Sequence, residues 1–377
     1  MMKTRGLEGV VATKSSICSI NDGVLRYRGY NIDELAECST FEEIIYLLWY
    51  GRLPLKDELM ALKQELNDHV DVPSEMFRQL KAYPIEHTHP MSVLRSAVST
   101  LGIFDAHEDE MNETANKAKA LRLQAKISTI VAGLGRVRQG KEPIPPRHDL
   151  SFAANFLYML NGELPSEIEE NAFNRALVLH ADHELNASTF TARVCVATLS
   201  DVYSGITAAI GALKGSLHGG ANGRVMKMLE EIGSVDRVEA YVDQALKEKR
   251  KIMGFGHRVY KNGDPRAKHL KDMSYQLTRL KNEPKWYDIS IKLADILRER
   301  KGLLPNVDFY SASVYHCLGI ENELFTPIFA VSRTAGWIAH IFEQYNDNRL
   351  IRPRALYIGP ESMPYIPIEE RNKVDII

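Results

Sequence analysis

Apolar side chains recur every three to four positions along most of the chain, the period that places them on one face of an α-helix. The segment TFEEIIYLLWYG shows this clearly, with Thr40 as a candidate N-cap, acidic residues in the first turn and Gly51 as the stop signal. The same period predicts further helices. They fall within residues 57–70, 89–104, 115–137, 151–160, 169–184, 201–215, 237–251, 288–300 and 327–345.

Near the start of the chain the period changes to simple alternation. The segment GVVATKSSICSINDGVLRYRGY alternates apolar and polar residues on both sides of Asn21, Asp22 and Gly23, which predicts a short β-hairpin. No other stretch is rich in strand signals, and the sequence has no internal repeat or low-complexity run. We therefore expect a mostly all-α fold with a small N-terminal β-hairpin.

Glycine-rich joints divide the expected helices into two groups. One joint is GSLHGGANG, and the other lies near Gly319, with a more charged sequence between them. Two chain crossings at glycines suit a hinge. We expect a large helical domain formed by residues 1–219 and 320–377, and a small domain formed by residues 220–319.

Two further segments bear on assembly. In the helix expected within 201–215, Gly205, Ala208 and Gly211 would let another backbone approach closely, so we expect this helix to be buried, with a subunit contact as one explanation. The tail from residue 351 onward is rich in proline and polar residues, and we expect it to run over a surface.

Composition excludes several functional classes. The 377 residues are 45% hydrophobic and 25% charged, and 47 Lys and Arg against 49 Asp and Glu give a net charge of −2. No bulk positive field attracts nucleic acid or an anionic membrane, so any anion site must be local. Four dispersed cysteines lack metal-finger spacing, and no signal peptide or long apolar run is evident. We expect reduced thiols in a cytoplasmic protein.

Two stretches place histidines where helices are expected to stop or start. In LHADHELNASTF, His180 and His183 lie three residues apart beside Glu184, which permits a metal site but matches no zinc or di-iron motif. A helix-end histidine with a local hydrogen bond is the simpler interpretation. In KGSLHGGANG, His218 precedes a helix start, which would keep the imidazole neutral and able to donate to a developing enolate. A hinge with an incidental histidine is the alternative.

The stretch MGFGHRVYKNGDPRAKHL surrounds His257 with positive side chains. Its GFGH turn is expected to leave backbone groups uncovered for a nucleotide-like ligand, although it fits neither a Rossmann fingerprint nor a P-loop. Asp264 and Pro265 predict a helix start with Arg266 in the first turn, where a cation opposes the helix dipole and needs an anion. A solvated basic loop is the alternative.

The last candidate residues lie near the C-terminus. Asp308 is at an expected helix start among apolar residues, either as a cap or as a base in apolar surroundings. Arg333 lies in an otherwise apolar helix, where a buried guanidinium must find an anion. Arg352 and Arg354 follow that helix on either side of Pro353.

Taken together, these stretches resemble the citrate synthase family, in its short, dimeric bacterial or archaeal type. The similarity spans nearly the whole chain and is carried, in order, by LHADHELNASTFTARV, GALKGSLHGGA, IMGFGHRVYKNGDPRAKHL, PNVDFYSASVYHCLGI, PIFAVSRTAGWIAHIFEQ and NRLIRPRALYIGP. The resemblance implies a homodimer whose two domains close over the substrates. It also implies condensation of acetyl-CoA with oxaloacetate and water to give citrate and CoA, without a metal or other cofactor.

The resemblance implies roles for individual residues. The catalytic positions are matched by His218, His257 and Asp308. Positions that bind oxaloacetate are matched by His183, His257, Arg266, Arg333 and Arg352, the last contributed from the partner subunit. The CoA nucleotide is expected to meet Met253, Gly254, Phe255, Gly256, Arg258 and Lys261.

The chemistry of these side chains agrees with the implied reaction. The methyl group of a thioester is a very weak carbon acid, so a carboxylate base such as Asp308 needs a donor such as His218 at the enol oxygen. His257 can meet the charge that develops on the keto oxygen of oxaloacetate. A dicarboxylate substrate would explain buried arginines that have no acidic partner nearby in the sequence.

Other functions stay open. A 2-methylcitrate synthase shares these groups and accepts propionyl-CoA, and one extra methylene in a pocket is worth only about 1–3 kcal/mol. A non-catalytic helical dimer that binds CoA or a dicarboxylate is expected to lack at least one of Asp308, His218 and His257, and all three are present. A metal-dependent hydrolase would lose its activity in excess chelator.

Overall fold

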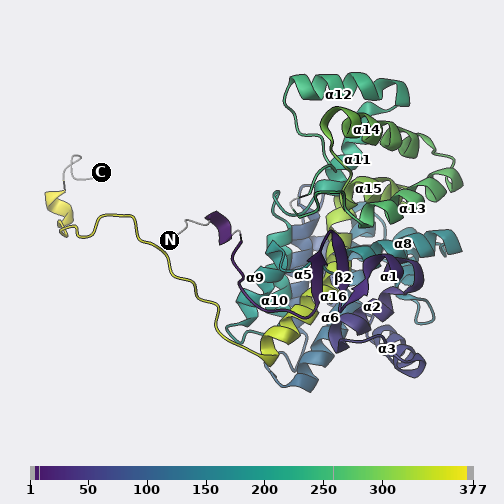
Figure 1. The fold of residues 1–377 in the computed structure, drawn as a ribbon. Helices are drawn as coiled ribbons and strands as arrows, with labels where there is room; N and C mark the ends of the chain where they lie inside the picture. The colour runs from purple at the N-terminus through teal and green to yellow at the C-terminus, as the bar shows by residue number, and fades with distance from the viewer. Residues whose placement is uncertain (1–4, 8, 258, 372–377) are drawn as a thin grey trace.

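The computed structural model describes residues 5–7, 9–257 and 259–371. The first half of the chain contains helices α1 Ile32–Cys38, α2 Phe41–Tyr50, α3 Lys56–Asp68, α4 Ser74–Ala82, α5 Pro90–Ile103, α6 Glu113–Arg138, α7 Phe152–Asn161 and α8 Glu167–His180. The second half contains α9 Ala187–Val196, α10 Val202–Leu213, α11 Ala221–Ile232, α12 Val238–Lys247, α13 Arg266–Leu280, α14 Lys285–Lys301, α15 Val307–Cys317 and α16 Phe325–Asn346. Short 3-10 helices occur at Arg5–Leu7, Val235–Arg237, Asn322–Leu324 and Ile368–Glu370. The expectation of a mostly helical fold is confirmed (Figure 1).

One antiparallel sheet lies near the N-terminus and has one strand more than the expected hairpin. Its strands are β1 Cys18–Asn21, β2 Val24–Tyr27 and β3 Tyr30–Asn31, in the order β1-β2-β3. The β1–β2 turn places Asp22 and Gly23 at φ angles of 53° and 78°, the left-handed conformation typical of tight hairpins. Tyr27 is fully buried, and its hydroxyl donates to the carbonyl of Asp182 at 3.0 Å. The sheet is thereby fixed against the loop that follows α8.

All the helices predicted from the hydrophobic period are present, with shifted ends. In α2, Thr40 caps the N–H of Glu43 while the Glu43 carboxylate accepts from the N–H of Thr40, which forms a capping box. The helix α8 ends at His180, so His183 lies in the following loop rather than in the helix. The period does not predict α1, α4 and α9, and for α11, α13 and α15 the sequence predicted only the helix starts, after His218, at Asp264 and Pro265, and at Asp308.

The helix α16 passes through the middle of the body and packs against α2, α6, α8, α9 and α10 (Figure 1). Gly336 makes one of these contacts very close, because a Cβ there would overlap the carbonyl oxygen of Ala181 and come within 2.5 Å of Asp182 Oδ1. In α10, a Cβ at Gly205 would lie 2.6 Å from Val196 Cγ1, so a neighbour in the same chain explains this glycine. The subunit contact expected for α10 stays a prediction.

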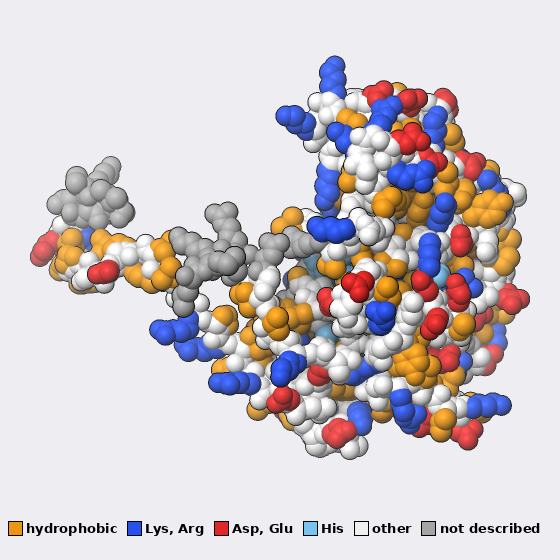
Figure 2. Space-filling view, viewed as in Figure 1, with side chains coloured by type: hydrophobic (Ala, Val, Ile, Leu, Met, Phe, Trp, Pro, Cys, Tyr) orange, Lys and Arg blue, Asp and Glu red, His pale blue; other side chains and the backbone are white. Residues whose placement is uncertain are grey.

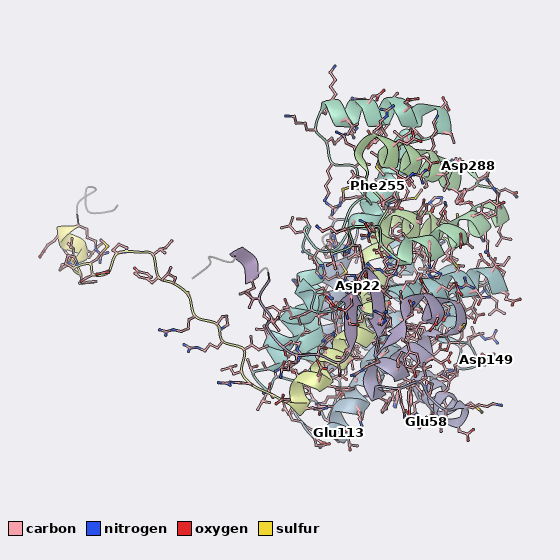
Figure 3. All side chains as sticks on the ribbon, in the orientation of Figure 1. Asp22, Glu58, Glu113, Asp149, Phe255 and Asp288 are labelled. Atoms are coloured by element: carbon pink, nitrogen blue, oxygen red, sulfur yellow. The ribbon has the colours of Figure 1, made fainter. Side chains whose placement is uncertain are left out.

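Polar and apolar side chains separate as expected for a globular chain. Figure 3 shows charged residues such as Glu113 and Asp149 at the periphery, and both are exposed. Phe255 instead lies among the helices, where its ring is 4.5 Å from the ring of Phe309. Among the described residues, no helix combines the length and the apolar character that crossing a membrane requires.

Helices α11 to α15 form a group at one end of the body, with α12 and α14 farthest from the rest (Figure 1). This group falls within the expected small domain of residues 220–319, whose movement as a separate unit stays a prediction. Two polar contacts connect α1 to this group, because Asp33 forms an ion pair with Lys268 and lies within hydrogen-bond distance of His269 Nε2 in α13, each at 2.7 Å. A further ion pair joins Glu169 of α8 to Lys281 at 2.5 Å.

The C-terminal segment leaves the surface of its own chain, so the expectation that it runs over a surface stays a prediction. After α16 the chain extends away from the body, and large apolar side chains on it are exposed to solvent (Figures 1 and 2). Tyr365 is 83% exposed and Ile358 is 91% exposed. Contact of such large apolar side chains with water is unfavourable, so a cluster of them favours burial against another surface.

Candidate active site

The candidate catalytic and oxaloacetate-binding residues meet at one cavity. It has a volume of about 660 Å³ and lies between the group α11 to α15 and the rest of the body. Histidine side chains, in pale blue, are visible in the recess at the middle of the face shown in Figure 2. The cavity is lined by His183, His218, His257, Arg266, Asp308 and Arg333, which come from separate segments of the chain.

Asp308 lies in the first turn of α15, where its side chain is half-buried at the cavity wall. It is not the helix cap, because the side chain of Asn306 has that role and accepts from the N–H of Asp308 at 3.1 Å. Burial raises the pKa of Asp308 to about 6, since an ionised carboxylate is poorly solvated there. The structure therefore favours the second of the two expectations, a base in apolar surroundings.

His218 is held as a neutral ring with a defined tautomer. The backbone N–H of Ser188 donates to His218 Nε2 at 3.2 Å, so this nitrogen is an acceptor and Nδ1 carries the proton. The Ser188 hydroxyl lies 2.8 Å from the same nitrogen and accepts from Trp337 Nε1 at 3.1 Å. Burial, together with the charge of Arg333, lowers the pKa of His218 to about 4. The expected neutral donor is present, but burial accounts for it rather than the helix start.

His257 shows the complementary tautomer. The backbone N–H of Val259 donates to His257 Nδ1 at 3.0 Å, which leaves the proton on Nε2. Burial and the nearby Arg266 lower the pKa of His257 below its ordinary value. Both histidines are thus neutral hydrogen-bond donors at neutral pH.

Tyr260 is a site residue that the sequence did not point to. Its buried hydroxyl lies 3.1 Å from Nε2 of His183, and its ring centre is 4.6 Å from that of His257. Burial lowers the pKa of His183 well below its ordinary value, with a further contribution from Arg266. The sequence offered one signal for Tyr260, its position three residues after His257. A single tyrosine in a loop can equally be a packing residue, so this signal alone does not identify a site residue.

Arg266 corrects one inference from the sequence, because its acidic partner lies only two residues away. Asp264 accepts from Arg266 Nε at 2.9 Å and from Nη2 at 2.8 Å, and both side chains are buried. The second carboxylate oxygen also accepts from the N–H of Val307 at 3.1 Å. Asp264 therefore orients the arginine and ties it to the start of α15, one residue before Asp308. This bidentate pair leaves Arg266 Nη1 for a ligand.

Arg333 fits the sequence expectation of a buried guanidinium without a direct acidic partner. Its Nε donates to the carbonyl oxygen of His180 at 2.7 Å, and its guanidinium carbon is 4.6 Å from the centre of the Phe329 ring. Burial lowers the pKa of Arg333. His180 itself is fully buried at the end of α8, and its Nδ1 donates to the carbonyl of Ala176 at 2.6 Å. The simpler interpretation of His180, a helix-end histidine bonded locally, is confirmed.

The GFG turn does not have the uncovered backbone that the sequence suggested. Gly254 O accepts from the N–H of Asn306 at 2.9 Å, and Gly256 bonds through its N–H to Leu304 O at 3.0 Å and through its O to the Asn306 amide at 2.9 Å. These hydrogen bonds and a bridge between Phe255 and Pro305 fasten the turn to residues 304–306, and both glycines have positive φ.

The other candidate CoA residues differ in their exposure and in where they lie. Phe255 is buried and Met253 is partly buried, while Lys261 is exposed. Gly256 and Lys261 line a smaller cavity of about 180 Å³ that also contacts His257. Arg258 lies outside the described residues. The CoA assignment stays a prediction.

Arg352 does not reach this cavity. It is exposed and absent from the cavity lining, and it belongs to the segment after α16 that extends away from the body (Figure 1). A contribution from a partner subunit is consistent with this position and stays a prediction. Over the described parts of the chain, no group of three or more His, Cys, Asp or Glu side chains is arranged to hold a metal ion.

Comparisons with known proteins agree with this site. The family profile described as "Citrate synthase, C-terminal domain" matches residues 6–354. "Citrate synthase 2" of Bacillus subtilis is 64% identical over 98% of this chain and 100% of its own length. "Citrate/2-methylcitrate synthase" of the same organism is 43% identical over 94% of this chain and 96% of its own length.

A solved structure shows that the similarity to citrate synthases extends to the fold. A ternary complex of citrate synthase from Thermoplasma acidophilum with carboxymethyl coenzyme A and oxaloacetate superposes with a TM-score of 0.91. It is 37% identical in sequence and is matched over 97% of this chain and 98% of its own. The profile match, the full-length relatives and the shared fold all cover nearly the entire sequence, and the chain therefore belongs to the citrate synthase family.

Proposed function

We propose that Asp308, His218 and His257 carry out the citrate synthase reaction of this chain, the condensation of acetyl-CoA with oxaloacetate and water to give citrate and CoA. The observation that supports this most strongly is their convergence at one cavity together with Arg266, Arg333 and His183. Family membership makes the chain an acyltransferase-type enzyme. The assignment of steps to side chains is our proposal.

In the first step, the Asp308 carboxylate takes a proton from the methyl group of acetyl-CoA. Its pKa of about 6 makes it a stronger base than an ordinary aspartate, while it stays ionised at neutral pH. His218 donates a hydrogen bond from Nδ1 to the enol oxygen, because Ser188 occupies Nε2. A neutral donor stabilises this oxygen without an additional charge in the cavity.

In the second step, the new carbon nucleophile attacks the keto carbon of oxaloacetate. His257 gives the proton of Nε2 to the keto oxygen, which becomes the hydroxyl group of the citryl thioester. Water then cleaves the thioester: a proton of the water restores Nε2–H of His257, the proton held by Asp308 goes to the CoA thiolate, and the new carboxyl group of citrate releases one proton to solvent. These side chains account for the proton transfers of the condensation, so the proposal invokes no metal and no further cofactor.

Oxaloacetate would be held by its two carboxylates. Arg266 and Arg333 line the cavity, and His183 lies beside His257 with their ring centres 5.3 Å apart. Guanidinium groups bind carboxylates with strong charge-assisted hydrogen bonds, and burial increases their strength. Because Arg266 belongs to α13 and Arg333 to α16, substrate binding would connect the group α11 to α15 with the rest of the body.

We further propose that the active form is a homodimer. The exposed apolar residues of the C-terminal segment favour a partner surface, and Arg352 lies on this segment. In a symmetric dimer the segment of each chain would reach the other, so that Arg352 of one subunit completes the oxaloacetate site of its partner. The cavity of an isolated subunit would then lack one cation.

A second acyl substrate is a specific alternative. The relative described as a citrate/2-methylcitrate synthase shows that family members close to this chain are not confined to acetyl-CoA. Propionyl-CoA adds one methylene, which a pocket distinguishes by about 1–3 kcal/mol. We propose acetyl-CoA as the main acyl donor because the chain is 64% identical to "Citrate synthase 2".

The rate of CoA release distinguishes these functions. Purified protein would be assayed with acetyl-CoA and with propionyl-CoA, each with and without oxaloacetate, in excess chelator. Oxaloacetate-dependent release that strongly favours acetyl-CoA is the expected result. Equal or faster release from propionyl-CoA would transfer the assignment to 2-methylcitrate synthase, and loss of activity in chelator would contradict the metal-free mechanism.

A further inference from the structure

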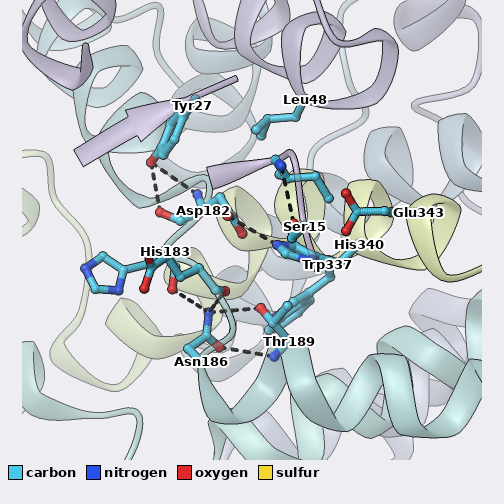
Figure 4. Close-up of polar contacts among 12 residues, drawn as sticks. Ser15, Tyr27, Leu48, Asp182, His183, Asn186, Thr189, Trp337, His340 and Glu343 are labelled. Carbon is cyan, nitrogen blue, oxygen red and sulfur yellow. Dashed lines mark hydrogen bonds and ion pairs between the residues drawn. The ribbon is translucent and has the colours of Figure 1, made fainter. Parts of the chain in front are cut away.

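Asp182 is a fully buried carboxylate that the proposed reaction does not use. It directly precedes His183, in the loop after α8. Tyr27 fixes its backbone, because the hydroxyl donates to Asp182 O at 3.0 Å and accepts from Asp182 N at 3.2 Å (Figure 4). A buried carboxylate is costly unless hydrogen bonds and a positive charge compensate it. The neighbours of its side chain therefore indicate its role.

His340 supplies a hydrogen bond to Asp182 but no charge. His340 Nε2 lies 3.4 Å from Asp182 Oδ2 (Figure 4). The other ring nitrogen, Nδ1, lies 3.2 Å from a guanidinium nitrogen of Arg193. Arginine is only a donor, so Nδ1 is an acceptor and His340 is a neutral ring with its proton on Nε2. The charge of Arg193 is taken by Glu343, at 2.7 Å.

Two arginines sense the charge of Asp182, Arg28 and Arg333, and of the two it is Arg333 that lines the cavity. Asp182 and Arg333 sit where α16 lies on the loop, since Gly336, one turn after Arg333, lets the helix approach Asp182 Oδ1. This oxygen has no hydrogen-bond partner among the described residues. Asp182 is the charged group that most raises the pKa of Arg333, although burial has the larger, opposite effect.

The arrangement differs from that of the other cavity arginine. Asp264 holds Arg266 by two direct hydrogen bonds. Arg333 bonds only through Nε to the His180 carbonyl, and within the described residues its terminal nitrogens have no protein acceptor at the cavity wall. A direct ion pair would occupy the nitrogens that bidentate carboxylate binding requires.

We propose that Asp182 is a positioning residue for oxaloacetate, which compensates the charge of Arg333 through space and leaves its terminal nitrogens open to a substrate carboxylate. This inference rests on the proposed role of Arg333 in oxaloacetate binding. The negative charge of Asp182 has two effects in this proposal. It makes the buried guanidinium tolerable in the free enzyme, and it weakens the attraction of the site for the substrate dianion.

The variant Asp182→Asn tests this role, because it removes the charge and keeps the size and the hydrogen bond from His340. The free variant is expected to melt at a lower temperature than the natural chain. Oxaloacetate then replaces the missing negative charge, so calorimetric titration should show at least about ten-fold tighter binding, the change expected for removing a like charge about 12 Å away at an effective dielectric constant near 20. The rise in melting temperature on adding oxaloacetate should exceed that of the natural chain.

A matched control is Glu343→Gln, which removes a carboxylate from the same network but one that serves Arg193. It should lower the melting temperature equally with and without oxaloacetate and leave the affinity within about two-fold. If Asp182→Asn behaves like this control, or binds oxaloacetate more weakly, the proposal is overturned.

If Asp182→Asn does not fold, the double variant Asp182→Asn/Arg333→Gln decides. Removing both members of a compensating buried pair is far less costly than removing one. A folded double variant supports the proposal, and an unfolded one overturns it. Failure of oxaloacetate to stabilise the natural chain would instead contradict the proposed function, whatever Asp182 does.

Discussion

At the scale of the residue, burial decides the protonation states of the site. It raises the pKa of Asp308 to about 6 and lowers that of His218 to about 4. An aspartate and a histidine in water have the opposite order of basicity. Here the carboxylate is the stronger base and the imidazole stays neutral, which is the pairing that proton abstraction from a weak carbon acid requires.

We predict that activity rises with pH through about pH 6 and then levels off, because Asp308 must be ionised to act as the base. His218 is neutral over this range, and the pKa of His257 is also lowered by burial, so both shifts favour the neutral rings that the reaction uses. The measurement is kcat from CoA release between about pH 5 and pH 8 at saturating oxaloacetate. Activity that is constant down to about pH 4.5 would contradict Asp308 as the base.

The variant Asp308→Asn should lose about 10²- to 10⁴-fold in kcat and retain oxaloacetate binding, since the amide keeps the size but accepts no proton. Steady-state kinetics and calorimetric titration measure the two quantities separately. The control is Asp295→Asn, an exposed residue of α14 that pairs with Arg298 and lies outside the cavity lining. This control should leave kcat unchanged.

The same substitution should stabilise the protein at alkaline pH. The folded chain binds the Asp308 proton more tightly than the unfolded chain, where the pKa is near 3.8. As pH rises from about 4 through 6, the unfolded chain releases this proton first, so stability falls and the penalty is complete above about pH 7. Asp308→Asn removes a penalty of up to about 3 kcal/mol at pH 8. Urea unfolding at pH 8 and pH 5 should show a gain that shrinks at the lower pH.

At the scale of the element, α16 closely approaches the loop after α8. This contact positions Arg333, which α16 carries, relative to Asp182 and His183 in the loop. We predict that Gly336→Ala lowers the free energy of unfolding by about 1–3 kcal/mol or more, because the new methyl group would overlap the Ala181 carbonyl. It should also raise the KM for oxaloacetate, since His183 lies in this loop. Urea unfolding and steady-state kinetics measure both effects.

The control for Gly336→Ala is Gly211→Ala in α10. At Gly211 a Cβ would meet only Arg95 Cδ, at 3.8 Å, which is an ordinary contact. Alanine has the higher helix propensity, so this variant should be neutral or more stable by up to about 1 kcal/mol. Equal losses for the two variants would mean that the contact with Ala181 is not the cause.

Elements differed in how well their sequences predict them. The capping box and stop glycine of α2 are local signals, and the helix lies where they predict. The turn at Asp22 and Gly23 is likewise set by local conformational preference. The short helix α9 depends on packing against α10 and α16, so its own residues carry little signal. The third strand β3 has only two residues and exists because β2 offers a free edge.

At the scale of the whole molecule, the proposed dimer requires that two chains complete one site. We predict that the inactive variants Arg352→Ala and Asp308→Asn restore activity when mixed. In a mixed dimer, one site combines Asp308 of the first variant with Arg352 of the second. Random subunit exchange would give about a quarter of the natural activity, because half of the dimers carry one complete site of two. CoA release after co-refolding is the measurement.

Two controls accompany this experiment. Mixing Arg352→Ala with natural subunits checks that exchange occurs, and Arg354→Ala tests a neighbouring arginine on the same segment. No recovery of activity, with exchange demonstrated, would show that Arg352 acts in its own subunit or has no role in the site. Removal of the segment after α16 should also weaken dimerisation, which analytical ultracentrifugation measures.

The sequence by itself determined the helical period, the hairpin turn, the order of the motifs and the residue types that carry the chemistry, because these depend on local geometry or on intrinsic reactivity. The tertiary structure decided which charges compensate one another. Asp264 pairs with Arg266 by two hydrogen bonds, whereas the proposed partners Arg333 and Asp182 come from segments about 150 positions apart that packing at Gly336 brings together. It also decided the protonation states of Asp308 and His218, since burial is a property of the assembled fold and not of any short stretch of chain.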